Sequence, residues 1–341
     1  MKKHLFVHIG SHKTATTFLQ NTFAINQVEL DRFGILYPRA ARAFGAHHHL
    51  AWSLRNPEMA SANLTQLDHW SAVIEEIEAS PHQKALVSTE DLEWIVDISR
   101  LAVLSDKFDV SVVFYLRSPD SYLESYYNQL VKDFKSRETR TLEGYIAESS
   151  MFFLDTSIIL NRWARVFGKD AIKLRLFGRK HITDGIEHDF LRVMGVPESP
   201  NFAPAKESIL QKTSLPPDAL DYLRLCNLHL SQNNRHHDFD VQLVQTANAN
   251  VSSLQSTRAG LLSLAAKRNV LRRFQATNKQ SVATYLGIEH TPFPVADAVA
   301  HMDYDSRLPA ATAEVMAKVA AMVRIETSLP SRSSTRKAAK K

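Results

Sequence analysis

The chain has 341 residues, of which 44% are apolar and 23% are charged, the composition of a globular protein with room for one sizeable α/β domain. The segment 330–341 holds five lysines and arginines and no acid, which accounts for the whole formal net charge of +5 and leaves the rest near neutral. This distribution argues against a nucleic-acid partner, and the single cysteine, Cys226, excludes an internal disulfide and every multi-cysteine metal site.

The sequence predicts neither a signal peptide nor a membrane span. The apolar run at residues 5–7 is too short for the core of a signal peptide, and no stretch approaches the roughly eighteen apolar residues of a spanning helix. We therefore expect a cytoplasmic protein without a transmembrane segment; the sequence does not indicate its oligomeric state.

Predicted strands and helices alternate along the chain. Four apolar runs suit strands of a parallel sheet, at residues 5–9, 85–88, 110–116 and 172–177. Helical spacing starts at Thr14, starts again at Pro119, and returns over 186–194, where Gly195 stops the last helix. This alternation predicts an α/β fold with a P-loop-like central parallel sheet flanked by helices and a helical C-terminal portion.

We expect a single domain over residues 1–329. Within it, the stretch 231–255 is rich in Asn, Gln, Ser and His, which predicts an insertion or a mobile loop. The basic tail 330–341 is predicted to be disordered, because it has too little apolar surface to offset the entropy of ordering.

The first chemical motif lies between the first predicted strand and its helix. It comprises Gly10, Ser11, His12, Lys13, Thr14, Ala15, Thr16 and Thr17. It departs from the Walker A pattern, because Ala15 replaces the second glycine and Thr16 occupies the lysine position. A loop here can direct backbone N–H groups and the positive end of a helix at one phosphate, with Lys13 beside it. The alternative is a well-capped helix start without a ligand.

The second motif follows the strand at 110–116. Arg117 leaves the sheet at its carboxyl edge, where a guanidinium can bind a phosphate through two hydrogen bonds. Ser125, two turns into the next helix, can add a hydroxyl. Phosphate sites at two strand ends indicate a ligand with two separated phosphates.

With these motifs the chain resembles the sulfotransferases that use 3′-phosphoadenosine 5′-phosphosulfate (PAPS), in particular a bacterial branch related to carbohydrate sulfotransferases. Residues 8–20 look like the 5′-phosphosulfate loop of that family, and 115–129 look like its 3′-phosphate motif. Weaker likeness continues at 163–168, 189–191, 195–196, 278–279 and 285–287, so the resemblance covers about residues 4–294. Ala15 departs from the glycine of many members, and 231–255 matches no family pattern.

The resemblance implies transfer of a sulfuryl group from PAPS to a hydroxyl or amine, on a carbohydrate or another small acceptor. Lys13 would neutralise charge on the oxygen that bridges phosphorus and sulfur as that bond breaks. The loop amides and threonines would hold the 5′-phosphate, Arg117 and Ser125 would hold the 3′-phosphate, and no metal would be required.

Such a reaction needs a base for the acceptor proton. Glu90 is the first candidate, because it follows the predicted strand 85–88 and shares the sheet edge with both motifs. It could equally be a strand-end acid paired with an arginine. The runner-up base lies in residues 47–49, where His48 and His49 are candidates to contact the acceptor. A metal site is disfavoured here, because three adjacent histidines cannot all point at one ion in regular structure. The cysteines and spaced histidine pairs of usual zinc sites are also missing.

Two further polar clusters have plainer interpretations. The basic run 132–140 could steer an anionic glycan, although a solvated helix end is the commoner reason for such a run, and 236–238 is a similar case. The rival functions are a P-loop-type nucleotide kinase, disfavoured by Thr16 at the lysine position, and a catalytically silent nucleotide-binding protein.

Overall fold

The computed structural model describes residues 2–196, 201–205, 214–229, 241–242, 244–245 and 260–298. The chain divides into two compact units: residues 1–123, 151–207 and 268–297 form the first, and residues 124–150, 208–267 and 298–341 form the second. The predicted tail 330–341, the cluster 236–238 and nearly all of 231–255 lie outside the described residues.

A five-stranded, all-parallel sheet with the order β2-β3-β1-β4-β5 forms the centre of the first unit. In that order its strands are Ile35–Leu36, Lys84–Ser88, Lys3–His8, Phe108–Arg117 and Ile172–Phe177. The predicted α/β class with a parallel sheet is confirmed, and the four predicted strands are all present. The edge strand β2 was not predicted, because two residues are too few to show a period.

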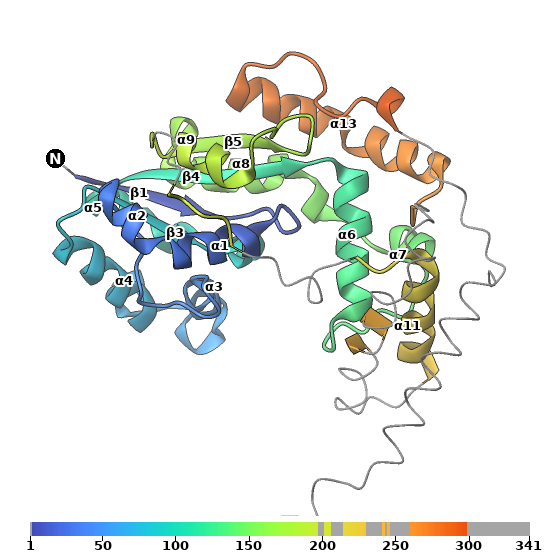
Figure 1. Ribbon diagram of the computed structural model, residues 1–341, viewed down its shortest axis with the longest axis horizontal. Helices are drawn as coiled ribbons and strands as arrows, with labels where there is room; N and C mark the ends of the chain where they lie inside the picture. Colours follow the sequence, from blue (N-terminus) through green and yellow to red (C-terminus); the bar gives the residue numbers. More distant parts are fainter. Residues whose placement is uncertain are drawn as a thin grey trace, which may run out of the picture. The chain divides into compact units, whose positions relative to one another are not determined.

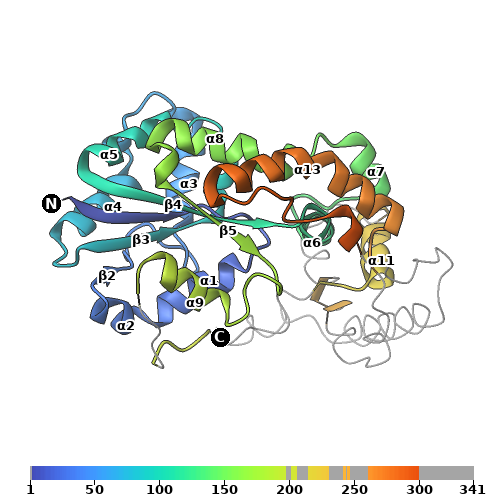
Figure 2. The same cartoon turned by 90° about the horizontal axis from the view of Figure 1, so that it is seen from above.

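Helices cover both faces of this sheet (Figures 1 and 2). One face carries α1 (Thr16–Ile25), α2 (Gln27–Arg32) and α9 (Ile186–Val193). The other carries α3 (His48–Arg55), α4 (Asp68–Ala79), α5 (Leu104–Lys107) and α8 (Thr156–Phe167). Short 3₁₀ turns connect these elements: η1 (Pro57–Met59), η2 (Leu64–Gln66), η3 (Glu90–Trp94), η4 (Ser99–Val103), η5 (Phe152–Leu154), η6 (Lys169–Ala171) and η8 (Val295–Asp297).

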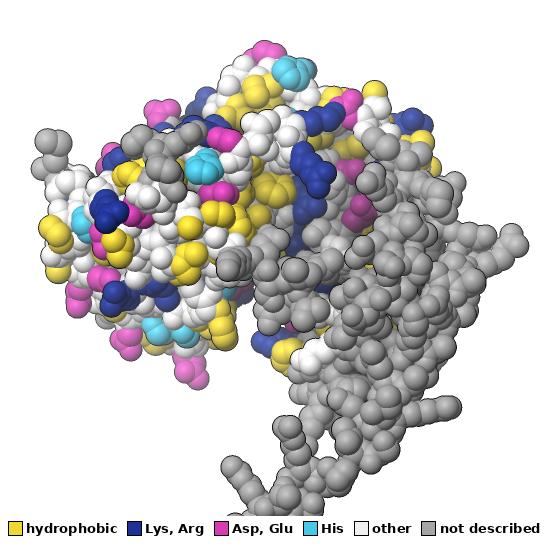
Figure 3. Space-filling view, in the orientation of Figure 1, with side chains coloured by type: hydrophobic (Ala, Val, Ile, Leu, Met, Phe, Trp, Pro, Cys, Tyr) yellow, Lys and Arg dark blue, Asp and Glu magenta, His cyan; other side chains and the backbone are white. Residues whose placement is uncertain are grey.

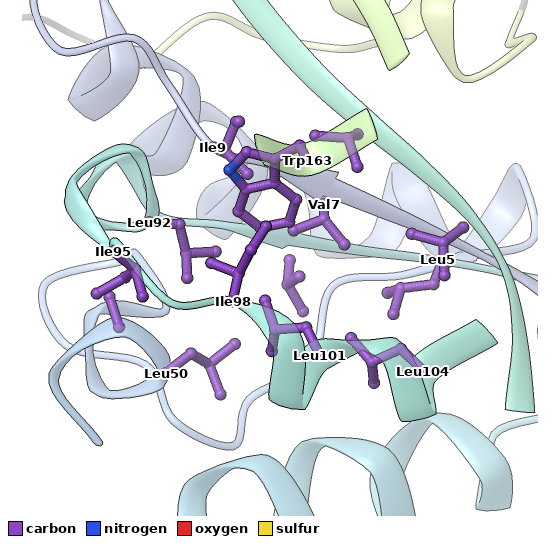
Figure 4. Close-up of a cluster of buried hydrophobic side chains, with 14 of the residues drawn as sticks. Leu5, Val7, Ile9, Leu50, Leu92, Ile95, Ile98, Leu101, Leu104 and Trp163 are labelled. Atoms are coloured by element: carbon purple, nitrogen blue, oxygen red, sulfur yellow. The ribbon is translucent and has the colours of Figure 1, made fainter. Parts of the chain in front are cut away.

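Strand β1 is apolar on both sides because both sides are covered. Leu5 and Val7 point into a cluster that includes Trp163 of α8, while Phe6 points into the opposite cluster with Phe190 of α9. Figure 4 shows the first cluster, with aliphatic side chains from β1, α3 and the η3–α5 region around the indole. Each fully buried side chain of this kind contributes about 1.5–3 kcal/mol, so the sheet is fixed beneath the loops that its strands carry.

The described residues of the second unit are mainly helical. Its described helices are most of α6 (Pro119–Lys132), α7 (Leu142–Glu148), α11 (Pro217–His229) and the first residues of α13 (Leu264–Leu286), whose remainder belongs to the first unit. Of these, α11 and α13 lie in the C-terminal portion that was predicted to be helical. The Asn128 side chain donates to the Leu215 carbonyl (2.9 Å) and accepts from its N–H (3.2 Å), which ties α6 to the segment before α11.

Charges of both signs are interspersed in the described part of the chain. In the basic run 132–140, Arg140 pairs with Glu138 (2.6 Å) and with Glu148 (3.1 Å), so local acids offset part of its charge. On the face drawn in Figure 3, acidic and basic side chains are mixed over its N-terminal part. No helix in the described ranges is long and apolar enough to cross a membrane.

Candidate functional site

The three central strands carry the predicted site residues at neighbouring carboxyl ends. β1 lies between β3 and β4, so the loop after β1 has Glu90 on one side and Arg117 on the other. Backbone bonds continue past the strand ends, from Thr89 N to His8 O (3.0 Å) and from Tyr115 N to Gly10 O (2.9 Å). The start of the loop is therefore fixed to both neighbours.

The backbone of the loop 10–15 adopts alternating conformations. Lys13 and Ala15 have positive φ values of 63° and 58°, whereas Thr14 between them does not. Such alternation directs successive N–H groups toward one side, which makes an anion-binding concavity. The N–H groups of Thr16 and Thr17, at the start of α1, also have no carbonyl ahead of them within the helix.

Gly10 leaves no room for a side chain. A Cβ atom there would lie 3.2 Å from the His12 nitrogen and 3.4 Å from Cβ of Glu90, and its φ of 113° is itself unfavourable for other residues. Gly10 thus allows the loop to pass close to the segment that carries Glu90.

Two predicted ligand hydroxyls stabilise the loop itself. Ser11 Oγ donates to the Tyr115 carbonyl (2.9 Å), and Thr14 Oγ1 donates to the Ser11 carbonyl (2.6 Å). Both side chains are buried. Their hydroxyl protons are therefore used for the loop conformation, and phosphate binding would fall to backbone N–H groups, Lys13, Thr16 and Thr17.

Arg117 brings the second motif onto the first. Its Nη1 donates to the Lys13 carbonyl, and its guanidinium lies 5.6 Å from the centre of the Phe177 ring. The Arg117 guanidinium thus contacts the backbone of Lys13, between the ends of β1 and β4. Ser125, the other predicted 3′-phosphate ligand, lies on α6 and belongs to the second unit.

Glu90 is a partly buried carboxylate beside the loop. Its Oε2 accepts from Nε2 of Gln20, on α1, at 2.6 Å. Burial alone would raise the pKa of this carboxyl, but the His12 charge and the Gln20 hydrogen bond outweigh it, so the pKa is lowered. Glu90 is therefore ionised at neutral pH and able to accept a proton.

The His12 side chain points toward η3. Its Nδ1 lies 2.6 Å from Oε2 of Glu93, the same oxygen that accepts the His12 backbone N–H at 2.8 Å. Its Nε2 lies 3.7 Å from Asp91. The predicted role of His12 as a phosphate ligand through its own N–H is thereby disfavoured, because Glu93 already occupies that donor.

The charge of His12 follows from opposing influences. Burial would lower its pKa, but Asp91 and Glu93 outweigh burial and raise the pKa to about 9. Trp94 Nε1, 2.8 Å from His12 Nδ1 and 3.1 Å from Nε2, suits a neutral ring instead, since an imidazolium has no lone pair to accept the indole N–H. Two carboxylates within 4 Å of the ring are the stronger influence. His12 is an imidazolium at neutral pH.

His48, a candidate base, belongs to a cluster around Asp91. Its Nδ1 lies 3.1 Å from Thr89 Oγ1 and 3.3 Å from Asp91 Oδ2, and its ring stacks on Trp52. Burial lowers the pKa of His48, but Asp91 and Glu90 outweigh it, so the pKa is raised. A carboxylate that orients an imidazole through Nδ1 is a common arrangement for a general base.

The other two histidines of the run have different surroundings. His47 is fully buried; its Nδ1 accepts from the Ser88 N–H (3.1 Å) and its Nε2 donates to the Pro38 carbonyl (2.9 Å), which makes it a neutral structural residue. His49 stacks on His69 of α4 and contacts Trp52. Among the described residues, no group of three or more His, Cys, Asp or Glu side chains could hold a metal ion.

Four residues that sequence reasoning missed complete the site: Gln20, Asp91, Glu93 and Trp94. The sequence offered a signal for Asp91 and Glu93, because residues 90–93 hold three acids directly after a predicted strand. Gln20 carried no such signal.

A separate cavity of about 460 Å³ lies against the edge strand β5, with Lys173, Arg175 and Tyr285 among its lining residues. None of the residues that line this cavity belongs to the two motifs. We therefore place the candidate site where the polar side chains of the motifs converge, and not at this cavity.

A scan against models of known protein families and a search of curated proteins both return no match for this chain.

Proposed function

We propose that this chain is a sulfotransferase, with a P-loop-like site that binds PAPS and transfers its sulfuryl group to a hydroxyl or amine. The observation that carries the proposal is the convergence of Lys13 and Arg117 at adjacent strand ends, where the guanidinium donates to the Lys13 carbonyl. A nucleotide with phosphates at both its 5′ and 3′ positions needs two such cationic sites close together.

In this scheme the loop N–H groups and the start of α1 hold the 5′-phosphate. Lys13 stabilises the negative charge that develops on the bridging oxygen as the S–O bond breaks, and PAP leaves with that electron pair. Arg117 binds the 3′-phosphate. The charge stabilisation comes from side chains and amides, so no metal ion is needed.

Glu90 takes the acceptor proton as the oxygen or nitrogen attacks sulfur. Two exposed aromatic side chains lie near the acids that follow β3. Trp52 is 41% exposed and donates to Asp91 (2.8 Å), and Phe152 is 49% exposed and packs on Trp94. Aromatic faces beside carboxylates suit an acceptor with a ring and several hydroxyls, which supports a carbohydrate.

The first test compares ligands. The protein should bind PAP and turn over labelled PAPS, but should not hydrolyse or transfer phosphate from ATP with Mg²⁺. Turnover of ATP would establish the kinase alternative, and binding of PAP without turnover of PAPS would establish the silent nucleotide-binding protein.

The second test assigns the 3′-phosphate. Arg117→Ala should weaken PAP binding by roughly 10- to 150-fold, the value of a charge-assisted bond to phosphate, and leave binding of adenosine 5′-phosphosulfate nearly unchanged. Arg192→Ala, a surface arginine paired with Asp184, is the matched control. An equal loss for both nucleotides would mean that Arg117 only supports the fold of the loop.

A further inference from the structure

Glu93 is a buried carboxylate with no place in the scheme above. Its side chain is only 1% exposed, and one oxygen, Oε2, accepts from both the N–H and the Nδ1 of His12. Its other oxygen, Oε1, has no hydrogen-bond partner in the described part of the chain. Burying a carboxylate is costly unless a charge compensates it, so the His12 imidazolium is the group that makes Glu93 tolerable there.

The pair joins two segments that are far apart in the sequence. His12 belongs to the phosphate loop, and Glu93 belongs to η3, which begins with Glu90. Because the Glu93 oxygen binds both the backbone and the ring of His12, a shift of the loop would break two hydrogen bonds together. The Glu93 carboxylate therefore links the loop directly to the turn that carries Glu90.

The same pair places a positive charge beside Glu90. The charged or titratable groups that act on Glu90 are His12 from the loop, His48 from α3, and the buried rings of His8 and Tyr37. His12 is the largest of the influences that keep Glu90 ionised against burial.

Resting on the proposed function, we propose that His12 and Glu93 are positioning residues for sulfuryl transfer. They hold the phosphate loop against the turn that carries the base, and they keep a positive charge next to the Glu90 carboxylate. Neither residue touches the donor or the acceptor; both act through Lys13 and Glu90.

The test uses His12→Gln and Glu93→Gln in the full chain, with His82→Gln as a control on a surface histidine near Asp31. Misplacement of reacting groups by about 1 Å costs about 10²-fold, so kcat should fall by about 10- to 100-fold in both variants while the KM for PAPS changes little. Glu90 should also become harder to ionise. The ratio of kcat/KM at pH 5.5 to that at pH 7.5 should therefore fall in His12→Gln, and by less in Glu93→Gln, which keeps the ring.

A second readout does not depend on turnover. The carboxyl carbon of Glu90, assigned by NMR through its loss in Glu90→Gln, should not titrate between pH 5 and 7.5 in the wild type but should do so in His12→Gln. If both variants keep the wild-type pH ratio and Glu90 titration and only their thermal stability falls, His12 and Glu93 are structural and the proposal is wrong. Absence of sulfuryl transfer in the wild type would overturn the proposed function instead, and the Glu90 titration would still decide the role of His12.

Discussion

At residue 15, an alanine holds a left-handed backbone conformation that glycine adopts more readily. Its φ of 58° costs about 1 kcal/mol for a residue with a Cβ atom. The loop keeps this conformation because neighbouring bonds impose it: Ser11 to Tyr115, Thr14 to Ser11, and His12 to Glu93. The loop thus accommodates a residue with a Cβ atom in this left-handed conformation.

The identity of the base is also decided at single residues. Glu90 has a lowered pKa and His48 a raised one, so the two candidates ionise on opposite sides of pH 5.5. If Glu90 is the base, kcat/KM should be level from pH 5.5 to 7.5 in the wild type. Glu90→Gln should then lower kcat by about 10²- to 10⁴-fold, while PAP binding is retained.

His48→Gln is the counterpart of that variant, and it should mainly raise the KM of the acceptor. A wild-type kcat/KM that falls steeply below pH 7, together with an inactive His48→Gln and an active Glu90→Gln, would make the His48–Asp91 pair the base. The assignment of Lys13 and Arg117 to the donor would be unaffected.

At the scale of elements, sequence patterns predicted what depends on neighbours along the chain. The strands around Val7, Val87 and Val112 were predictable because each is a short apolar run followed by polar residues, and their parallel pairing follows from the helices between them. Lys13 and Arg117 were predicted as site residues for the same reason, since each lies in a motif that is local in the sequence; their roles stay predictions.

What the sequence could not indicate is contact between distant segments. His12 and Glu93 are separated by 81 residues, and only the adjacency of β1 and β3 brings them together. Nor could it separate His47 from His48. These neighbours differ because His47 precedes α3 and packs its ring on Tyr37, whereas His48 is the first residue of α3 and lies beside Asp91.

Asp189 of α9 also contacts distant segments, and its contribution to stability can be tested by mutation. The buried carboxylate accepts from the Tyr115 hydroxyl (2.8 Å) and from Nε (3.0 Å) and Nη2 of Arg175, so it joins α9 to β4 and β5. Asp189→Ala should lower the free energy of unfolding by about 2–3 kcal/mol, because Tyr115 loses its acceptor while the partly exposed Arg175 can be rehydrated.

Urea unfolding of the variant measures this effect. Asp184→Ala, which removes a solvent-exposed partner of Arg192, should leave the midpoint nearly unchanged. Equal midpoints for the two variants would show that Asp189 does not hold α9 on the sheet.

For the molecule as a whole, histidines set how stability depends on pH. Burial lowers the pKa of His8 to about 4 and that of His47 to about 3, so both are neutral in the folded chain and take up protons more readily when it unfolds. His12 affects the free energy of unfolding in the opposite direction, because its pKa is raised to about 9 in the folded chain. Its stabilising contribution is complete below pH 6.5 and is lost as the pH rises toward 9. Stability should therefore be greatest near pH 6.5–7.

The acidic side of this profile gives the sharpest prediction. A histidine with an unfolded pKa of about 6.5 that must remain neutral in the folded state costs up to about 2 kcal/mol at pH 5, so His8 and His47 together should lower the free energy of unfolding by up to about 4 kcal/mol between pH 7 and pH 5. Urea titrations across this range measure the slope. His8→Asn keeps a polar amide beside Ser88 Oγ in place of Nδ1 but cannot titrate, so it should remove about half of the slope even if it is less stable at pH 7. His82→Gln, at the surface, should retain the wild-type slope. If His8→Asn and the wild type lose stability in parallel as the pH falls, the buried His8 ring is protonated without cost and is not the group that limits the fold in acid.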